Sequence, residues 1–90
     1  MGVDVAVLND TLTVLDRCLS LGGRARDFGA GTPLLGSLPE LDSMAVVGVI
    51  TGLEEHFGIT VNDDEISADT FETVGSLVQF VEHKLAPSTR

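Results

Sequence analysis

The stretch that decides the fold is LDSMAVVGVITGLEEHFG, residues 41–58, because it contains the start, the body and the end of one helix. Asp42 is a residue type whose side chain accepts hydrogen bonds from the unpaired N–H groups of a first helical turn. Gly58 is expected to end the helix, because glycine adopts the left-handed backbone of a helix terminus at little cost. Apolar residues recur between them at steps of three and four, which predicts a helix over about residues 42–57. Its expected buried stripe is Val46, Ile50, Leu53 and Phe57, with Val49 beside it.

Two glycines, Gly48 and Gly52, lie inside this helix and share a face. A glycine in a helix interior costs roughly 1 kcal/mol relative to alanine. Packing, more than intrinsic propensity, must therefore hold this helix together.

The residues before this helix predict another helix followed by a long loop. Apolar spacing predicts the helix over about residues 4–21, and Gly22 and Gly23 are expected to end it. The loop, residues 22–41, contains five glycines and Pro33, which exclude long regular structure. We expect apolar side chains to hold the loop against the helices and its tip, residues 29–31, to be mobile. These apolar residues are Phe28, Leu34, Leu35 and Leu38.

Two further helices are predicted after residue 58. Ser67 and Thr73 are both residue types that cap helix starts, and they predict a short helix over about residues 67–71 and a last helix over about residues 73–85. Pro87 is expected to stop the last helix. The fold class is therefore all-α, a four-helix bundle with three long helices and one short one, in a single domain over residues 1–90.

The composition of the chain narrows the partners and the compartment that we expect for it. The chain has 90 residues, 43% of them hydrophobic but only 4% aromatic, which predicts an aliphatic core that repacks easily. Fourteen acidic residues against five basic ones give a net charge of -9, which disfavours nucleic acid and membrane surfaces and favours a monomer whose partners carry basic patches. Cys18 is the single cysteine, so no internal disulfide forms, and we expect a cytoplasmic protein without a targeting segment.

Three segments together resemble the acyl carrier protein family. They are LDSMAVVGVI at residues 41–50, LEEHFGITV at residues 53–61 and FETVGSLVQFV at residues 71–81. The resemblance implies that Ser43 carries a 4′-phosphopantetheine arm, taken from coenzyme A by a phosphopantetheinyl transferase, with Asp42 and Met44 completing the attachment motif. It implies a carrier of acyl thioesters rather than an enzyme. The position is physically suitable, because a helix start offers free N–H donors to a phosphate.

The resemblance also implies an acyl pocket and a partner surface. We expect the acyl chain to slip between the helices where Val46, Val47 and Ile50 face the last helix. The alternative is that these three residues are only part of the core. Partner enzymes with basic docking patches are expected on the exposed side of the helix over residues 42–57, at Gly48, Thr51, Gly52, Glu54 and Glu55. Gly48 departs from the family pattern, in which a glutamate is common, so the two glycines form either a smooth strip for close approach or tolerated surface positions.

Other site chemistries fit less well. Residues 62–65 are acidic, but they lack the glycine and glutamate spacing of an EF-hand loop, and we expect no metal site. A hydrolase would need a base beside Ser43, whereas His56 lies roughly 20 Å away at the far end of the same helix.

Within the carrier class, the cargo stays open. A free-standing acyl carrier is the first interpretation, and the stretch DDEISADTFETVGSL, residues 63–77, is similar to carriers of bacterial exosortase and exopolysaccharide loci. The alternatives are an aminoacyl or peptidyl carrier loaded by an adenylating enzyme, and an acidic helical interaction domain that is never modified.

Overall fold

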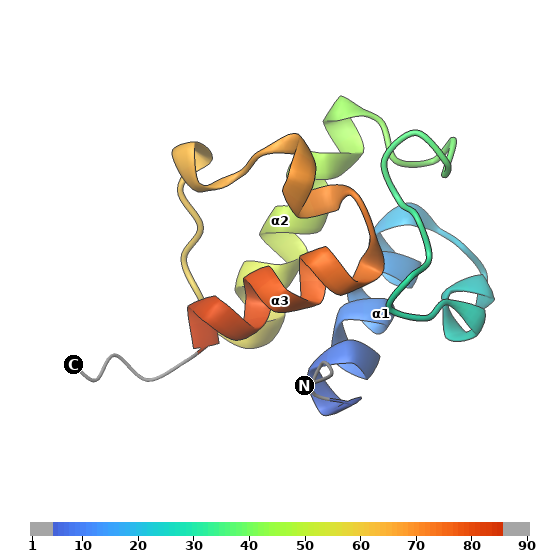
Figure 1. Cartoon of the computed structure of the whole chain (residues 1–90), viewed down its shortest axis with the longest axis horizontal. Helices are drawn as coiled ribbons and strands as arrows, with labels where there is room; N and C mark the ends of the chain where they lie inside the picture. Colours follow the sequence, from blue (N-terminus) through green and yellow to red (C-terminus); the bar gives the residue numbers. More distant parts are fainter. Residues whose placement is uncertain (1–4, 86–90) are drawn as a thin grey trace.

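The computed structural model describes residues 5–85, except for the side chain of Asp63. Three α-helices, α1 (Val5–Leu19), α2 (Ser43–Phe57) and α3 (Val74–Leu85), carry the fold (Figure 1). Three short 3-10 helices lie in the connections: η1 (Arg24–Asp27), η2 (Asp63–Glu65) and η3 (Ala68–Phe71). The predicted all-helical bundle is confirmed, with η3 as its short helix. The predicted start at Asp4 and stop at Pro87 lie outside the described residues.

The end of α1 differs from the prediction. The helix stops at Leu19, and Ser20 rather than Gly22 is the first residue with a left-handed backbone, at φ 55°. The N–H of Leu21 donates to the carbonyl oxygen of Asp16 at 3.0 Å, the bond that closes such a terminus. Gly22 and Gly23 also have positive φ, but they belong to the turn that follows.

The 3-10 helix η1 was not predicted, because a residue from another element stabilises its start. The Asp16 carboxylate of α1 accepts from the N–H groups of Gly23 at 2.8 Å and Ala25 at 3.2 Å. Ala25 is buried beneath α1. A glycine-rich stretch thereby gains a helical turn that its own sequence does not predict.

The second half of the loop is tied to α3. The N–H of Gly75 donates to Ala30 at 2.7 Å, and the N–H of Val74 donates to Thr32 at 2.9 Å. Leu34 is completely buried, as predicted, whereas Leu35 is 43% exposed. The tip at residues 29–31, which was expected to be mobile, therefore contains a residue that is hydrogen-bonded to the first turn of α3.

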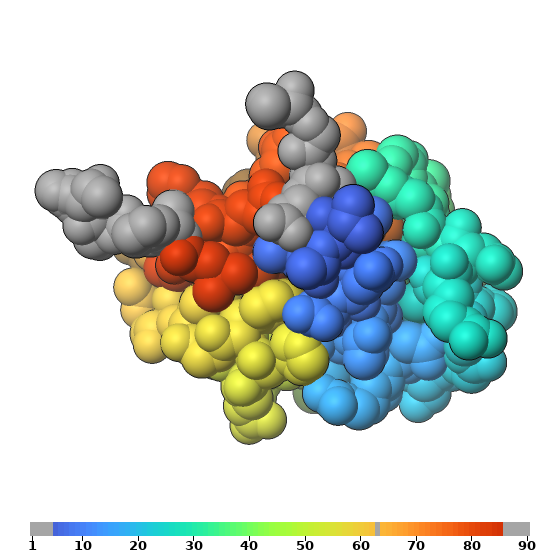
Figure 2. All heavy atoms as spheres, turned by 90° about the horizontal axis from the view of Figure 1, so that it is seen from below, coloured from blue at the N-terminus to red at the C-terminus, as the bar shows by residue number. Residues whose placement is uncertain are grey.

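The core is aliphatic apart from Phe71, and every main element contributes to it. Fully buried side chains include Val14, Leu15, Leu34, Val49, Leu53, Phe71, Val74, Leu77, Val78 and Val81. Figure 2 shows α1 flanked by residues 20–30 on one side and by the end of α2 on the other, with α3 beyond. No helix within residues 5–85 is long and apolar enough to cross a membrane.

The buried side of α2 is rotated from the predicted stripe. Val49 and Leu53 are the buried residues, whereas Val46, Ile50 and Phe57 are only partly buried at its edge. On this side, Gly52 of α2 packs directly against α1. A Cβ atom there would lie 2.8 Å from Cys18 Sγ and 3.0 Å from Val14 Cγ1.

Candidate functional site

The start of α2 is held by its neighbours on both sides. Leu41 is 4% exposed and anchors the chain in the core immediately before the helix. Asp42 is the N-cap, as predicted, and its Oδ1 accepts from the N–H of Ala45 at 2.8 Å. Its carbonyl oxygen accepts from the N–H of Val46 at 3.0 Å. The cap therefore fixes where α2 begins and which residue is first.

Ser43 is the first residue of α2, and it is exposed. The N–H groups of Ser43 and Met44 belong to the first turn, so they have no acceptor within the helix. They add hydrogen-bond donors to the positive end of the helix dipole. An exposed hydroxyl beside such donors fits a phosphodiester, which needs an accessible oxygen to attach to and positive partial charge near its anionic oxygens.

An ion pair holds the segment that leads into the site. Arg24 of η1 pairs with the Glu40 carboxylate, and its Nε donates to the carbonyl oxygen of Leu21 at 3.1 Å. The hydrogen bond from Arg24 holds the pKa of the Glu40 carboxyl below its ordinary value. The ion pair therefore attaches η1 to Glu40, three residues before Ser43.

The exposed face of α2 runs from Ser43 along the helix. Met44 is 80% exposed and Val47 is 62% exposed, and Gly48, Thr51 and Glu55 are exposed beyond them. Val47 was predicted in the acyl pocket facing the last helix, and that prediction is wrong. Its spacing of three from Met44 and four from Thr51 is the sequence signal that would have placed it on this face.

Two residues predicted on the partner surface are engaged inside the protein. Gly52 faces α1, where a Cβ atom would lie 2.8 Å from Cys18 Sγ and 3.0 Å from Val14 Cγ1, so it belongs to the packing and not to an exposed strip. Glu54 is partly buried, and its Oε2 accepts from the N–H of Val61 at 2.8 Å. That bond holds the segment after α2 against the helix end. Of the two neighbouring glutamates, Glu55 is the exposed one.

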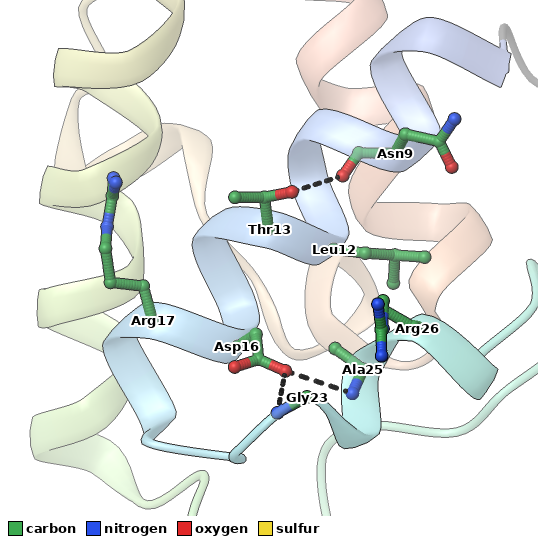
Figure 3. A pocket seen from close by; sticks show the side chains of 8 residues that line it. All are labelled: Asn9, Leu12, Thr13, Asp16, Arg17, Gly23, Ala25 and Arg26. Carbon is green, nitrogen blue, oxygen red and sulfur yellow. Dashed lines mark hydrogen bonds between the residues drawn. The ribbon is translucent and has the colours of Figure 1, made fainter.

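The predicted acyl pocket residues and one hollow of the described structure lie in different places. Val46 and Ile50 pack against the core as partly buried residues. A hollow of about 640 Å³ lies between α1 and the η1 segment (Figure 3). Leu12, Asp16 and Arg17 line it from α1, and Ala25 and Arg26 line it from η1. Sequence spacing did not indicate this hollow, because η1 itself was not predicted.

Glu65 and Asp10 each lie beside a basic side chain of another element. Lys84 Nζ lies 2.8 Å from Glu65 Oε1, and this hydrogen bond lowers the pKa of the Glu65 carboxyl. His56 Nε2 lies 3.7 Å from Asp10 Oδ1. Among the side chains that the structure describes, no group of three or more His, Cys, Asp and Glu residues is placed to hold a metal ion.

Comparison with known proteins defines the class. Residues 25–81, well over half of the chain and including Ser43, match the family described as "Phosphopantetheine attachment site". The chain is also similar to a holo acyl carrier protein from Nitrosomonas europaea, solved by solution NMR, with 59% sequence identity and a TM-score of 0.81. That match covers 87% of this chain and 94% of the relative.

The chain belongs to the phosphopantetheine-attachment family and, within it, to the acyl carrier proteins. Its prosthetic group is accordingly 4′-phosphopantetheine.

Proposed function

We propose that Ser43 is the residue that carries the 4′-phosphopantetheine group, and that the chain uses it to carry acyl groups between enzymes. The observation that carries this proposal is the position of Ser43. It is exposed, it is the first residue of α2, and it directly follows the Asp42 cap. Ser37 and Ser67 are also exposed, but neither begins an α-helix.

The residues around Ser43 have distinct tasks in this proposal. Ser43 supplies the oxygen that forms the phosphodiester, while the nucleotide portion of coenzyme A leaves and the transferase takes the serine proton. The N–H groups of Ser43 and Met44 face the resulting negative charge. Asp42 contributes by starting the helix at that place. When bound, the group supplies a terminal thiol on which acyl groups are held as thioesters.

The protein then acts as a carrier, and its partners supply the catalysis. A hydrolytic role for Ser43 would need a general base within hydrogen-bond reach. His56 Nε2 instead lies 3.7 Å from Asp10 Oδ1 of α1, and His56 is at the opposite end of α2 from Ser43. Partners of such a carrier include a phosphopantetheinyl transferase and acyl-handling enzymes. The net charge of -9 supports basic docking patches on them and a monomeric carrier.

The partner surface in this proposal is the exposed face of α2. It consists of Met44, Val47, Gly48, Thr51 and Glu55. Its first two turns carry no charged side chain and present two exposed apolar ones, so the acidic contribution comes only from Glu55 at the far end. Partners are therefore expected to pack an apolar surface beside Ser43 and to place positive charge farther along the helix.

The proposal is tested by modification and intact mass. The purified apo protein is incubated with coenzyme A, Mg²⁺ and a phosphopantetheinyl transferase of broad specificity. We expect the mass to rise by one phosphopantetheine group, and we expect no rise in Ser43→Ala. Ser37→Ala is the matched control, because it removes an exposed loop serine and should still be modified. If the wild-type chain is not modified, the result favours an interaction domain. If Ser43→Ala is still modified, the attachment site is another residue.

A further inference from the structure

We propose that Arg24 is a positioning residue for the modification of Ser43, and that it acts through Glu40 by fixing the chain that leads into α2. The inference rests on the proposed function, because it takes Ser43 as the residue that receives the 4′-phosphopantetheine group. It goes beyond that proposal by giving η1, an element of the connection between α1 and α2, a role at the attachment site.

The attachment of η1 to α1 is the first step. The Asp16 carboxylate of α1 accepts from the N–H groups of Gly23 and Ala25, at 2.8 and 3.2 Å (Figure 3). Arg24 lies between these two residues, and its Nε donates to the carbonyl oxygen of Leu21 at 3.1 Å. The start of η1 is therefore fixed on α1, and one nitrogen of the Arg24 guanidinium group is held there with it.

The same guanidinium group continues this attachment to the chain before α2. Its Nη2 pairs with Oε2 of Glu40, whose side chain is 31% exposed. The other carboxylate oxygen, Oε1, is buried, and no donor among the described residues bonds to it. A partly buried carboxylate depends on its hydrogen-bonded partner, because burying an unpaired charge is unfavourable. Without Arg24, the Glu40 carboxylate gains by turning into water, and the backbone at residue 40 is free to follow.

The short distance along the chain connects Glu40 to the reacting hydroxyl. Leu41 and Asp42 are the two residues between Glu40 and Ser43. Leu41 holds the helix start from the core, and Asp42 holds it from within α2 by accepting from the N–H of Ala45 at 2.8 Å. The pair of Glu40 with Arg24 holds it from η1. Restricting the chain before a reacting hydroxyl favours transfer, because less freedom is lost when the hydroxyl meets the phosphate.

The test measures the transfer of phosphopantetheine from coenzyme A to the purified apo protein by intact mass, with kcat and KM determined separately. We expect Arg24→Gln to lower kcat about three- to fivefold, the size expected from one partly exposed ion pair, and to change KM less than about twofold. Arg24→Lys keeps the charge and loses the second donor, so an intermediate kcat is expected. Adding Glu40→Gln to Arg24→Gln should cause no further loss, since the two side chains form one contact.

Arg26→Gln is the matched control. It removes the same charge from the same 3-10 helix, at an exposed arginine without an ion pair among the described side chains. We expect it to keep the wild-type kcat. Amide hydrogen exchange, followed by NMR, separates positioning from a general loss of stability. In Arg24→Gln, exchange should become faster at Ala45, which bonds the Asp42 cap, and stay unchanged at the buried Leu53 in the body of α2.

Three results would overturn the inference. They are a wild-type kcat in Arg24→Gln, an equal loss of kcat in Arg26→Gln, and equally faster exchange at Ala45 and Leu53. The second would show a general effect of charge on the transferase, and the third a general loss of stability. Failure of the proposed function looks different, because the wild-type chain itself would then not be modified at Ser43.

Discussion

At the scale of single residues, Gly48 and Gly52 show how one helix gives the same residue type two different roles. Both are helical glycines in α2, four positions apart. A Cβ atom at Gly48 would have no atom within 4 Å, whereas one at Gly52 would contact Cys18 and Val14 of α1. Only Gly52 is required for the close approach of the two helices.

We therefore predict opposite effects of two alanine substitutions. Gly52→Ala should lower the free energy of unfolding by about 1–3 kcal/mol, because the methyl group would overlap Cys18 Sγ and Val14 Cγ1. The exposed Cys18 side chain can rotate away, whereas the fully buried Val14 has little room to move. Gly48→Ala should raise it by roughly 0.5–1 kcal/mol, because alanine restricts the unfolded chain and favours a helix. Urea denaturation of both variants measures the difference. Equal effects of the two substitutions would contradict the assignment of Gly52 to the helix interface.

At the scale of elements, α2 is defined by its two ends. Asp42 caps the first turn, and Gly58, at φ 69°, closes the last turn by donating its N–H to the carbonyl oxygen of Glu54 at 2.8 Å. The Glu54 carboxylate then binds the N–H of Val61, so the segment after the helix begins at a fixed place. The ends of α2 therefore set the position of Ser43 as much as its buried face does.

Removing the cap should weaken this element. Asp42→Ala leaves the N–H of Ala45 without its acceptor and is expected to lower the free energy of unfolding by about 1 kcal/mol. Asp42→Asn keeps an oxygen at the cap and loses the charge interaction with the helix dipole, so about half that loss is expected. Urea denaturation at neutral pH compares the two. If the asparagine variant is as unstable as the alanine variant, the hydrogen bond is not the source of the cap's effect.

At the scale of the whole molecule, the chain has a net charge of -9. Two ion pairs hold segments that connect its α-helices. Glu65–Lys84 joins the η2 segment to α3, and Glu40–Arg24 joins η1 to the chain before α2. Each lysine or arginine lowers the pKa of its glutamate through a side-chain hydrogen bond. A lowered pKa in the folded state stabilises the fold above the ordinary pKa of 4.5, and this stabilisation is lost as the pH falls through the folded-state value.

The substitution Glu65→Gln should therefore have a pH-dependent effect. At pH 7 the variant is expected to be slightly less stable than the wild type, because it lacks the charge that binds Lys84. The difference should vanish once the pH falls well below 4.5, since the wild-type glutamate is then protonated as well. Thermal denaturation at constant ionic strength measures this difference in stability. The control is Glu72→Gln, because Glu72 is exposed and has no ion pair among the described side chains. A constant difference at all pH values would contradict the assignment.

The locally encoded features of the fold were predictable. The caps at Asp42 and Thr73 and the stop at Gly58 depend on bonds between residues within four positions of one another, and all three lie where the sequence predicted them. The position of Ser43 at the start of α2 follows from the same bonds. The predicted end of α1 was two residues too late, because Ser20 adopts a left-handed backbone that its residue type does not favour.

The sequence by itself determined that three α-helices form, where α2 and α3 are capped and that a serine begins α2, because these depend on residues that are neighbours along the chain. The tertiary structure alone decided which sides of α2 are buried, so it placed Val47 outside, Gly52 against α1 and Glu54 on the segment that follows. It also placed η1 beside α1, by joining the Asp16 carboxylate to backbone N–H groups seven and nine residues away, and so formed the hollow between them. The physical reason is that helical periodicity defines a face, whereas only contact with another element shows which face is covered.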